Sequence, residues 1–491
     1  MSVGQQKRRN RFQRAGAAPR RKYQQRRREA ARLEARQAKK EKPQPTKGGK
    51  RLGFSAHASL CALGRHIKGM RCFQGLYSTV RIAQKTVTHR PVDKLVDCMV
   101  GMMAGISAVS QINTTVRADT VLCLCFGRVG CAEQSVIQNT LDACLPENVT
   151  QLQKVLMEQL QEHGACRRHN FGRRLLELDI DLSGKLAGAK AEGSTKGYFP
   201  GARNGRGRQL VRILASQYDE IVCQWMVPGN TNSSVVLKEA VGRAQAVLEL
   251  TAEQRRRTLI RADAGFGTDE NIEWLLGEGY QVLVKEYSAS RSAKLGRSVT
   301  RWEGTQQVGR DIGLPAAPHA YSKATVQIVV RKPRKKKKGK DQDQGEPGWS
   351  YHVLISTLSE RPLQELVKLY DARGGHPESS FQQDGQGLRL TKRQKKRMDA
   401  QQMLVGLAQM AHNLLVWARH WAKQSAHERG IAQWGLLRWV RDVLAIPGMV
   451  EVDGERVNVT LRATHPLSGS FLQAFSDLLA RSGTLLSLGE I

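Results

Sequence analysis

Three acids share one face of a short apolar stretch, RRLLELDIDLSG (173–184). With the period-two alternation of a strand, Glu177, Asp179 and Asp181 fall on one face and apolar side chains fall on the other. Neighbouring carboxylates repel one another when partly buried, and a divalent cation is the simplest partner that holds them together. The alternative is an edge strand with a solvated polar face, and the pattern leaves both interpretations open.

A fourth acid, Asp263, ends the apolar stretch RRRTLIRADAGF (255–266). We predict a strand at 257–263, a Gly-containing turn, a helix at about 269–277 and a further strand at 280–286. Ligands of α/β sheets collect at strand ends, which is where Asp263 is expected.

A separate carboxylate, Glu378, lies in YDARGGHPESSF (370–381). Pro377 suits the first position of a helix, and the helix dipole favours an acid in the first turn. This preference alone accounts for Glu378, so the acid does not identify a site without other evidence.

The elements that position these acids alternate between strands and helices. Beyond the acidic strand we predict strands at 209–216 and 220–227 and a helix at 235–250. Together with the strands around Asp263, they describe an α/β layer fold with a mixed sheet. Two later strands, 324–330 and 350–357, flank a polybasic loop that is either solvated surface or a clamp on a phosphate backbone.

The region before the acidic strand is predicted to be mostly helical. Residues 92–112 repeat apolar side chains at three- and four-residue intervals. Two short helices around a break within 118–145 are compatible with a helix-turn-helix reader of DNA or with a plain helical bundle. Near the C-terminus, an apolar stripe over 403–421 predicts a long core helix.

The charge balance indicates a polyanionic partner. The 491 residues contain 78 Lys+Arg and 44 Asp+Glu, a formal net charge of +34. No run approaches 18 apolar residues, which argues against a membrane partner and in favour of nucleic acid. The first 50 residues alone hold 18 Lys+Arg and three acids, which predicts a disordered arm that either binds phosphates or serves as a solubilising tail.

The nine cysteines include no CxxC pair, and we interpret them as reduced cytosolic thiols. Zinc ligation by His163, Cys166 and His169, or by Cys123 and Cys125, is a weaker alternative, because structural zinc sites show paired ligands at regular spacing.

The segments LDIDLSG, IRADAGF and YDARGGHPESSF resemble the three acidic motifs of the DDE transposases of bacterial insertion sequences. The similarity spans roughly residues 90–425 and is strongest around Asp263. It implies an α/β ribonuclease H-like catalytic core with a β-rich insertion, preceded by a helical DNA-binding domain and a disordered basic arm.

The resemblance also implies a catalytic triad of Asp181, Asp263 and Glu378, with Asp179 as the competitor for the first position. These acids would hold two Mg²⁺ ions, or Mn²⁺, for phosphodiester cleavage and strand transfer. Arg373 and Lys285 would contact DNA phosphates. Gly385 stands where the family usually has a lysine, and Lys392 or Arg393 is the expected substitute.

We expect five regions: a basic arm (1–52), a helical, DNA-binding domain (53–165), a catalytic domain (166–286 and 358–425), a β-rich basic insertion (287–357) and a mainly helical C-terminal region (426–491). The expected partners are double-stranded DNA, as element ends and as target, and a second copy of the chain in a synaptic complex. The expected location is the cytoplasm, at the nucleoid. The alternatives are a ribonuclease H-like nuclease without strand transfer and an inactive, transposase-derived DNA-binding protein.

Overall fold

The computed structural model describes residues 50–85, 88–199, 201–202, 204–305, 307, 309–333, 348–375, 377–390, 394–424 and 429–490. Within these ranges, the side chains of residues 374, 375, 377–380, 383 and 429 are not described. All but the last three residues of the predicted basic arm, 1–52, and most of the polybasic loop lie outside the described residues.

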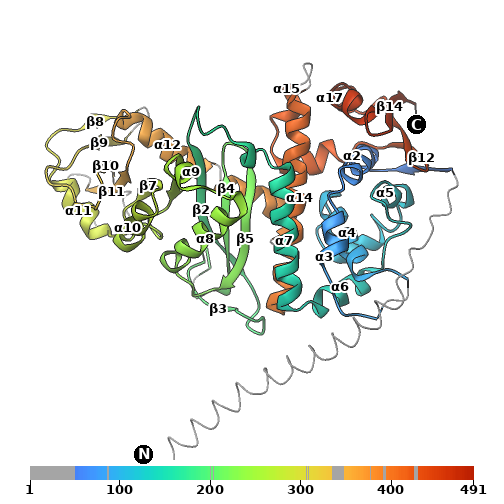
Figure 1. The fold of residues 1–491 in the computed structure, drawn as a ribbon, viewed down its shortest axis with the longest axis horizontal. Coiled ribbons are helices and arrows are strands. Elements are labelled where there is room, and N and C mark those ends of the chain that lie inside the picture. Colours follow the sequence, from blue (N-terminus) through green and yellow to red (C-terminus); the bar gives the residue numbers. More distant parts are fainter. Residues whose placement is uncertain are drawn as a thin grey trace, which may run out of the picture.

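One mixed sheet of ten strands forms the centre of the larger half of the molecule (Figure 1). Its strands are β2 (Leu176–Leu186), β3 (Thr195–Lys196), β4 (Arg206–Ala215), β5 (Glu220–Pro228), β6 (Thr258–Ala262), β7 (Gln281–Lys285), β8 (Glu303–Gly304), β9 (Asp311–Gly313), β10 (Val326–Pro333) and β11 (Trp349–Ser356). Five of them run in the order β5-β4-β2-β6-β7, antiparallel across the first two pairings and parallel across the next two. The predicted strands therefore occur at the expected places and in a mixed sheet.

Helices cover both faces of this sheet. On one face, Ile180, Ala262 and Val284 join a core that includes α8 (Ser233–Leu248) and α10 (Asp269–Gly277). On the other face, Leu259, Leu283 and Leu354 pack with buried residues of α12 (Leu363–Gly375). The next helix, α13 (Pro377–Gln386), contacts β2. Short helix α9 (Ala252–Arg256) precedes β6.

The predicted insertion, 287–357, extends the central sheet. It begins with α11 (Ala289–Arg297), and β11 then pairs antiparallel with β7, followed outward by β10, β9 and β8. Next to the base of the polybasic loop, the guanidinium of Arg331 lies between the rings of Trp302 and Trp349, 4.2 and 4.3 Å from their centroids. These contacts stiffen the hairpin that carries the loop.

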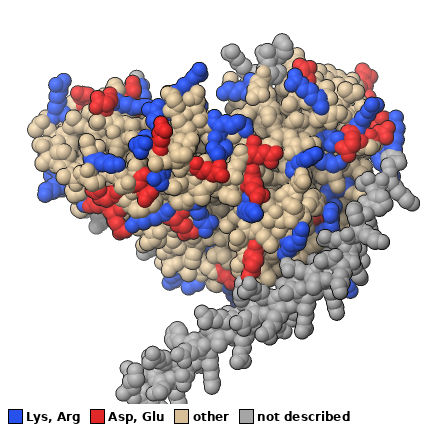
Figure 2. Space-filling view, viewed as in Figure 1, with Lys and Arg blue, Asp and Glu red and all other residues tan. Residues whose placement is uncertain are grey.

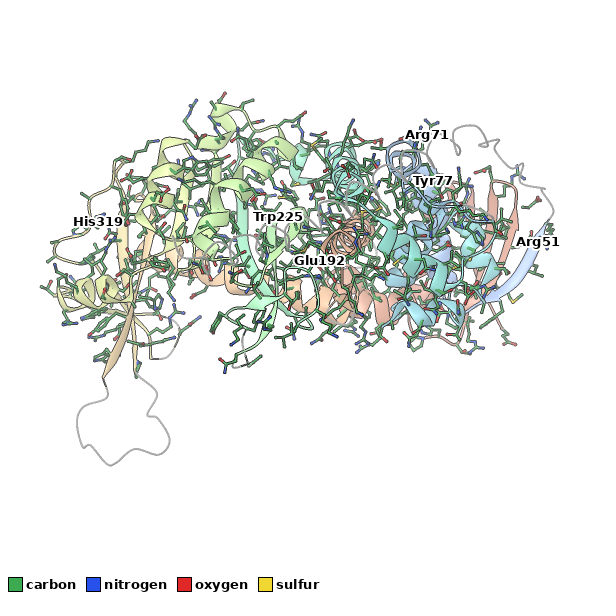
Figure 3. The ribbon with its side chains drawn as sticks, turned by 90° about the horizontal axis from the view of Figure 1, so that it is seen from below. Arg51, Arg71, Tyr77, Glu192, Trp225 and His319 are labelled. Carbon is green, nitrogen blue, oxygen red and sulfur yellow. The ribbon has the colours of Figure 1, made fainter. Side chains whose placement is uncertain are left out.

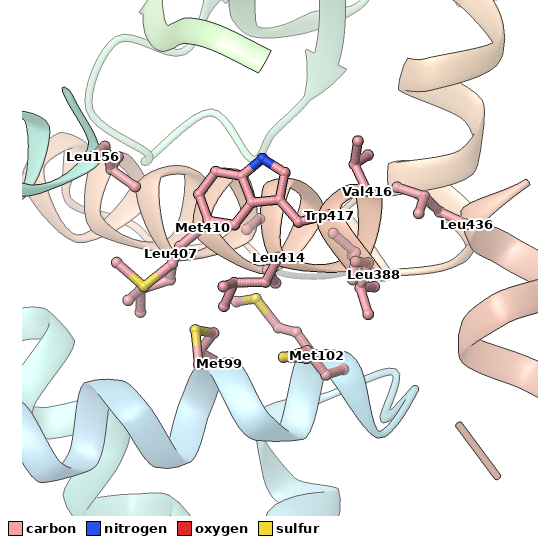
Figure 4. Packing of buried hydrophobic residues seen from close by; sticks show 14 of the residues in the cluster. Met99, Met102, Leu156, Leu388, Leu407, Met410, Leu414, Val416, Trp417 and Leu436 are labelled. Carbon is pink, nitrogen blue, oxygen red and sulfur yellow. The ribbon is translucent and has the colours of Figure 1, made fainter. Parts of the chain in front are cut away.

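A long helix, α14 (Met398–Gln424), connects the sheet to the helical part of the chain. It packs against β5 and against α4, α6 and α7. Figure 4 shows Met99 and Met102 of α4 facing Leu407, Met410 and Leu414 of α14. The predicted apolar stripe is thus a core contact between the two halves.

Amide side chains on another face of α14 cover the outer edge of β5. Gln402 bonds both the N–H and the C=O of Met226, at 2.8 and 2.9 Å, and Asn413 does the same for Ile221, at 2.9 and 3.0 Å. A bare strand edge is a template for aggregation, so these amides protect it as well as fixing the helix.

The predicted helical domain, 53–165, is helical apart from its first strand. Its helices are α2 (Ala58–Gly69), α3 (Gln74–Thr79), α4 (Pro91–Met103), the 3₁₀-helix η1 (Val109–Asn113), α5 (Thr120–Cys125), α6 (Gln134–Ala143) and α7 (Pro146–His163). The pair considered as a helix-turn-helix, α5 and α6, is separated by residues 126–133 instead of a tight turn, and α6 packs on α4 and α14. This arrangement favours the plain bundle.

The C-terminal region, for which we expected mainly helices, holds strands as well. Beside α15 (Arg429–Ala432), α16 (Leu436–Arg438), a π-helical turn (Trp439–Val443) and α17 (Ser468–Ala480), it holds β12 (Gly448–Asp453), β13 (Arg456–Arg462) and β14 (Thr484–Gly489). β12 and β13 form a hairpin with the two-residue loop Gly454–Glu455, in which Gly454 has φ +56°. The period-two stretch VEVDGERVNVTL carries this signal.

The first described strand, β1 (Arg51–Ser55), pairs with β12, giving a four-stranded sheet in the order β1-β12-β13-β14. The start and the end of the described chain therefore share one unit. In Figure 3, Arg51 of this sheet and His319 of the insertion lie at opposite ends of the long axis, with Trp225 and Glu192 between them.

Two remaining expectations concern single residues. All nine cysteines are described and none forms a disulfide. His169 bonds Tyr218 Oη through Nδ1 and the Arg174 carbonyl through Nε2, and no three metal-ligating side chains gather among the described residues, which leaves the zinc alternative unsupported. Within the described chain, no helix combines the length and the apolar character needed to cross a bilayer.

Candidate active site

Two of the predicted catalytic acids lie side by side. In the parallel pairing of β2 with β6, Ile180 is opposite Ala262. Asp181 is the next residue of β2, and Asp263 is the first residue after β6. Neighbouring strands lie about 4.8 Å apart, so the two carboxylates begin from adjacent backbone positions on the same face. The N–H of Gly265 donates to Asp263 Oδ1 at 3.0 Å and orients that carboxylate.

Arg373 of α12 reaches the same place. Its Nη2 donates to the Ile180 carbonyl at 2.8 Å and lies 3.4 Å from Asp181 Oδ1, and the guanidinium is buried. Burial works to lower the pKa of Arg373, but the surrounding groups, Asp181 foremost among them, outweigh it and raise that pKa. A permanently charged group is thus fixed beside the acids.

Lys285 ends β7, one position beyond the pairing of Ala262 with Val284, and so follows Asp263 across the sheet. Burial lowers the pKa of Lys285, and the nearby cations Lys332 and Arg310 lower it further, against the opposing effect of Asp263. We call Lys285, Arg310 and Lys332 the basic strip. The basic strip extends from Lys285, next to Asp263, to Arg310 and Lys332 in the insertion.

His352 of β11 lies within the basic strip. Burial and the charges of Lys285, Arg310 and Lys332 lower the pKa of His352 to about 3. The ring is therefore neutral at physiological pH, because the strip already concentrates positive charge there.

Asp179, the competitor for the first catalytic position, has structural partners instead. Arg261 Nε and Nη2 bond its two carboxylate oxygens at 2.6 and 2.8 Å, and Ser216 donates to it as well. The Asp179 carboxylate is fully buried, whereas the side chain of Asp181 is 16% exposed. Only Asp181 is accessible to a substrate.

The third acid, Glu378, lies in the first turn of α13, and its side chain is not among those described. Phe381, one turn further on, packs its ring 4.3 Å from the guanidinium of Arg212, which is opposite Asp181 in the β2–β4 pairing. The structure therefore brings the helix of Glu378 to the strand of Asp181. Lys392 and Arg393 lie outside the described residues.

The donor set of this site suits a hard divalent cation. Asp181 in the middle of β2 and Asp263 directly after β6 offer carboxylate oxygens, and such oxygens are what Mg²⁺ prefers. Both carboxylates are only partly buried, which leaves room for water and phosphate ligands. A third ligand is absent from the described side chains, and the position of α13 makes Glu378 the candidate to supply it.

Sequence reasoning missed three groups near the site. Arg212 and Arg261 interrupt the apolar runs QLVRILA and TLIRA, and a lone arginine in a buried strand signals a buried carboxylate partner. His352 gave no such signal, because its neighbours in the basic strip come from separate strands and loops.

Comparison with known proteins adds a separate line of evidence. A family model described as "Transposase DDE domain group 1" matches residues 60–482. No curated protein matches the chain in sequence at a significant level.

Two solved structures are similar to parts of the chain. One is described as "Cryo-EM structure of piggyBac transposase synaptic complex with hairpin DNA (SNHP)", with 12% identity, a TM-score of 0.39 and coverage of 80% of this chain and 82% of that chain. The other, "Crystal structure of a pre-cleavage Mos1 transpososome", has 15% identity, a TM-score of 0.16 and coverage of 43% of this chain and 66% of that chain. With TM-scores this low, neither similarity supports a conclusion about this structure.

Proposed function

Because the chain belongs to the family of transposases with a group 1 DDE domain, we propose that it is a DNA transposase that cuts the ends of an insertion sequence and joins them to target DNA. The observation that carries the proposal is the adjacency of Asp181, in the middle of β2, and Asp263, directly after the parallel strand β6, beside the buried Arg373.

The catalytic core in this proposal is ribonuclease H-like. Its five strands are the series β5-β4-β2-β6-β7, with three antiparallel strands followed by two parallel ones, and the acids stand where β2 and β6 adjoin. The β-rich insertion then corresponds to α11 and β8–β11, and the acid-bearing helix α13 follows it in the chain.

The proposed metal ligands are Asp181, Asp263 and Glu378, holding two Mg²⁺ ions or Mn²⁺. When bound, such ions activate water or a 3′-hydroxyl and stabilise the charge on the leaving oxygen. The protein's own contribution is positioning and charge. Arg373, fixed by the Ile180 carbonyl, offers a cation to the phosphate at the scissile position, and Gly265 keeps the Asp263 carboxylate oriented. No covalent protein nucleophile is needed.

DNA follows the basic strip in this proposal. Lys285 neighbours Asp263, and Arg310 and Lys332 continue the positive charge toward the base of the polybasic loop. On the face shown in Figure 2, Lys and Arg are interspersed with Asp and Glu, so the net charge of +34 does not by itself locate the DNA. In this proposal the DNA lies along the strip, because its cations continue from the acids on the same face of the sheet. We place Lys392 and Arg393 among the DNA contacts as well, from their positions after α13 in the sequence.

Joining two element ends in one event requires two active sites, so the proposed working unit is a homodimer with both ends bound. Its substrates place it with the chromosomal DNA, at the nucleoid of a bacterial cell.

The deciding experiment incubates the protein with Mg²⁺ and DNA that carries the element's ends, and compares wild type with Asp263→Asn. We expect cleaved and joined products from wild type and none from the variant. Cleaved ends without joined products would instead identify a nuclease. Equal cleavage by both proteins would exclude enzymatic activity at this site and leave a DNA-binding protein.

A further inference from the structure

A buried network of charged side chains connects three elements behind the acids. Arg212 of β4 donates through Nη2 to Asp384 Oδ2 of α13 at 2.6 Å, and Asp384 Oδ1 lies 2.8 Å from Nδ1 of His412 in α14. Arg212 also donates to Gln224 Oε1 of β5, at 3.0 and 2.8 Å, and Gln224 donates to the Val405 carbonyl of α14. Arg212, Asp384 and His412 are each at most 2% exposed.

This network holds α13 from its second half. Asp384 is six residues after Glu378, about 9 Å along the helix axis. Between them, Phe381 lies over the Arg212 guanidinium at 4.3 Å and near Lys185 Nζ at 5.6 Å. Residues three apart share a helix face, so the side of α13 that starts at Glu378 rests on the strand partner of Asp181.

The hydrogen bonds of His412 specify its protonation. Its Nε2 lies 2.8 Å from the Asp219 carbonyl, and its Nδ1 faces the Asp384 carboxylate. Both partners are acceptors, so the ring makes both bonds only when each nitrogen carries a proton. Burial works to raise the pKa of Asp384, but His412 and Arg212 outweigh it and hold that pKa below its usual range.

Such a network is a costly way to gain stability. A buried ion pair gives little net stabilisation over apolar packing, because desolvation offsets the attraction. The network instead fixes the orientation of the Asp384 carboxylate. The guanidinium of Arg212 and the ring of His412 can each bond that carboxylate only in a narrow range of directions.

We propose that Arg212, Asp384 and His412 are positioning residues that fix α13, and with it Glu378, over Asp181. The proposal rests on the proposed function for the role of Glu378, but the restraint on α13 does not. The restraint acts on the second half of α13, where Asp384 binds Arg212 and His412.

The first test measures backbone hydrogen exchange in the full-length protein without metal or DNA. We expect Asp384→Asn and the milder His412→Gln to increase exchange across residues 377–386 by about tenfold or more, as local opening of that helix becomes easier. The matched control is Asp97→Asn, which breaks a similarly buried pair with Arg128, 2.9 Å long, in the helical domain. That control should leave exchange in α13 unchanged. Unchanged exchange in α13 of His412→Gln would overturn the proposal.

The second test measures the Mg²⁺ concentration that gives half-maximal cleavage. A displaced Glu378 weakens metal binding, so we expect His412→Gln to raise this concentration about tenfold, with activity recovered at high Mg²⁺. A lower maximal rate at unchanged Mg²⁺ dependence would contradict the positioning role. If Asp263→Asn cleaves like wild type, the proposed function fails, whereas the exchange result still decides whether the network restrains α13.

Discussion

Asp179 and Asp181 are two residues apart on the same face of β2, but they have different partners. Asp179 is buried against Arg261, and Asp181 is partly exposed beside Arg373. We expect Asp179→Asn to lower the free energy of unfolding by about 3 kcal/mol or more, because Arg261 keeps its charge in a buried site. Asp181→Asn should lower it by less, because Arg373 keeps its bond to the Ile180 carbonyl and still has Asp263 nearby. The same change should lower cleavage more than the roughly 100-fold that an outer-shell partner costs. Urea unfolding and a cleavage assay separate the two, and a stable, inactive Asp179→Asn would reverse the assignment.

His352, which lies within the basic strip, should make the free energy of unfolding depend on pH. Its pKa is about 3 in the folded protein and near 6.5 when unfolded, so between these values the unfolded chain binds more protons. Stability is therefore lost as pH falls below about 6.5, by about 1 kcal/mol between pH 6.5 and 5.5. We expect His352→Gln to lack this part of the acid sensitivity, as measured by urea unfolding at pH 7.5, 6.5 and 5.5. If the free energy of unfolding falls equally with pH in wild type and in His352→Gln, then His352 has the same proton affinity in the folded and in the unfolded protein, and the prediction is wrong.

At the scale of elements, the turn after β6 determines where Asp263 lies. Gly267 lies so close to the backbone of β7 that an added Cβ would be 1.9 Å from the Lys285 carbonyl oxygen. The carbonyl oxygen of Gly267 also accepts a hydrogen bond from the N–H of Tyr287, at 3.1 Å. We expect Gly267→Ala to cost about 1–3 kcal/mol of stability and to reduce cleavage, since the turn must shift. Gly277→Ala, where nothing lies within 4 Å, is the control and should stabilise by about 0.5–1 kcal/mol. Normal cleavage by Gly267→Ala would mean that the turn tolerates displacement.

At the scale of the whole molecule, α14 joins the central sheet to a helical and C-terminal unit, and the basic strip lies on the insertion side of that sheet. If DNA follows the strip, each cation that meets a phosphate releases a counterion. We expect Lys332→Ala to reduce the slope of log K against log salt by about 0.9 for DNA carrying an element end. Lys154→Ala removes one charge from α7, where the Lys154 side chain is 60% exposed, and should leave the slope unchanged. Equal slopes for all three proteins would place the DNA elsewhere.

Local patterns in the sequence were enough for the strands and helices around the central sheet. Period-two alternation predicted β2, and the apolar run before Asp263 predicted β6, because strand burial depends on near neighbours in the chain. The same rule applied to 448–462 would have found the C-terminal hairpin.

What the sequence by itself determined is therefore the order of the strands and helices and the residue types available for metal and phosphate chemistry. Only the tertiary structure decided which acid faces solvent, since Asp179 and Asp181 occupy the same face of β2 but meet different partners. It also brought Arg212, Asp384 and His412 together from three elements, and it placed Arg51 beside Val452 across some 400 residues. Contacts between distant segments depend on how sheets and helices pack, and residue spacing along the chain carries no record of that packing.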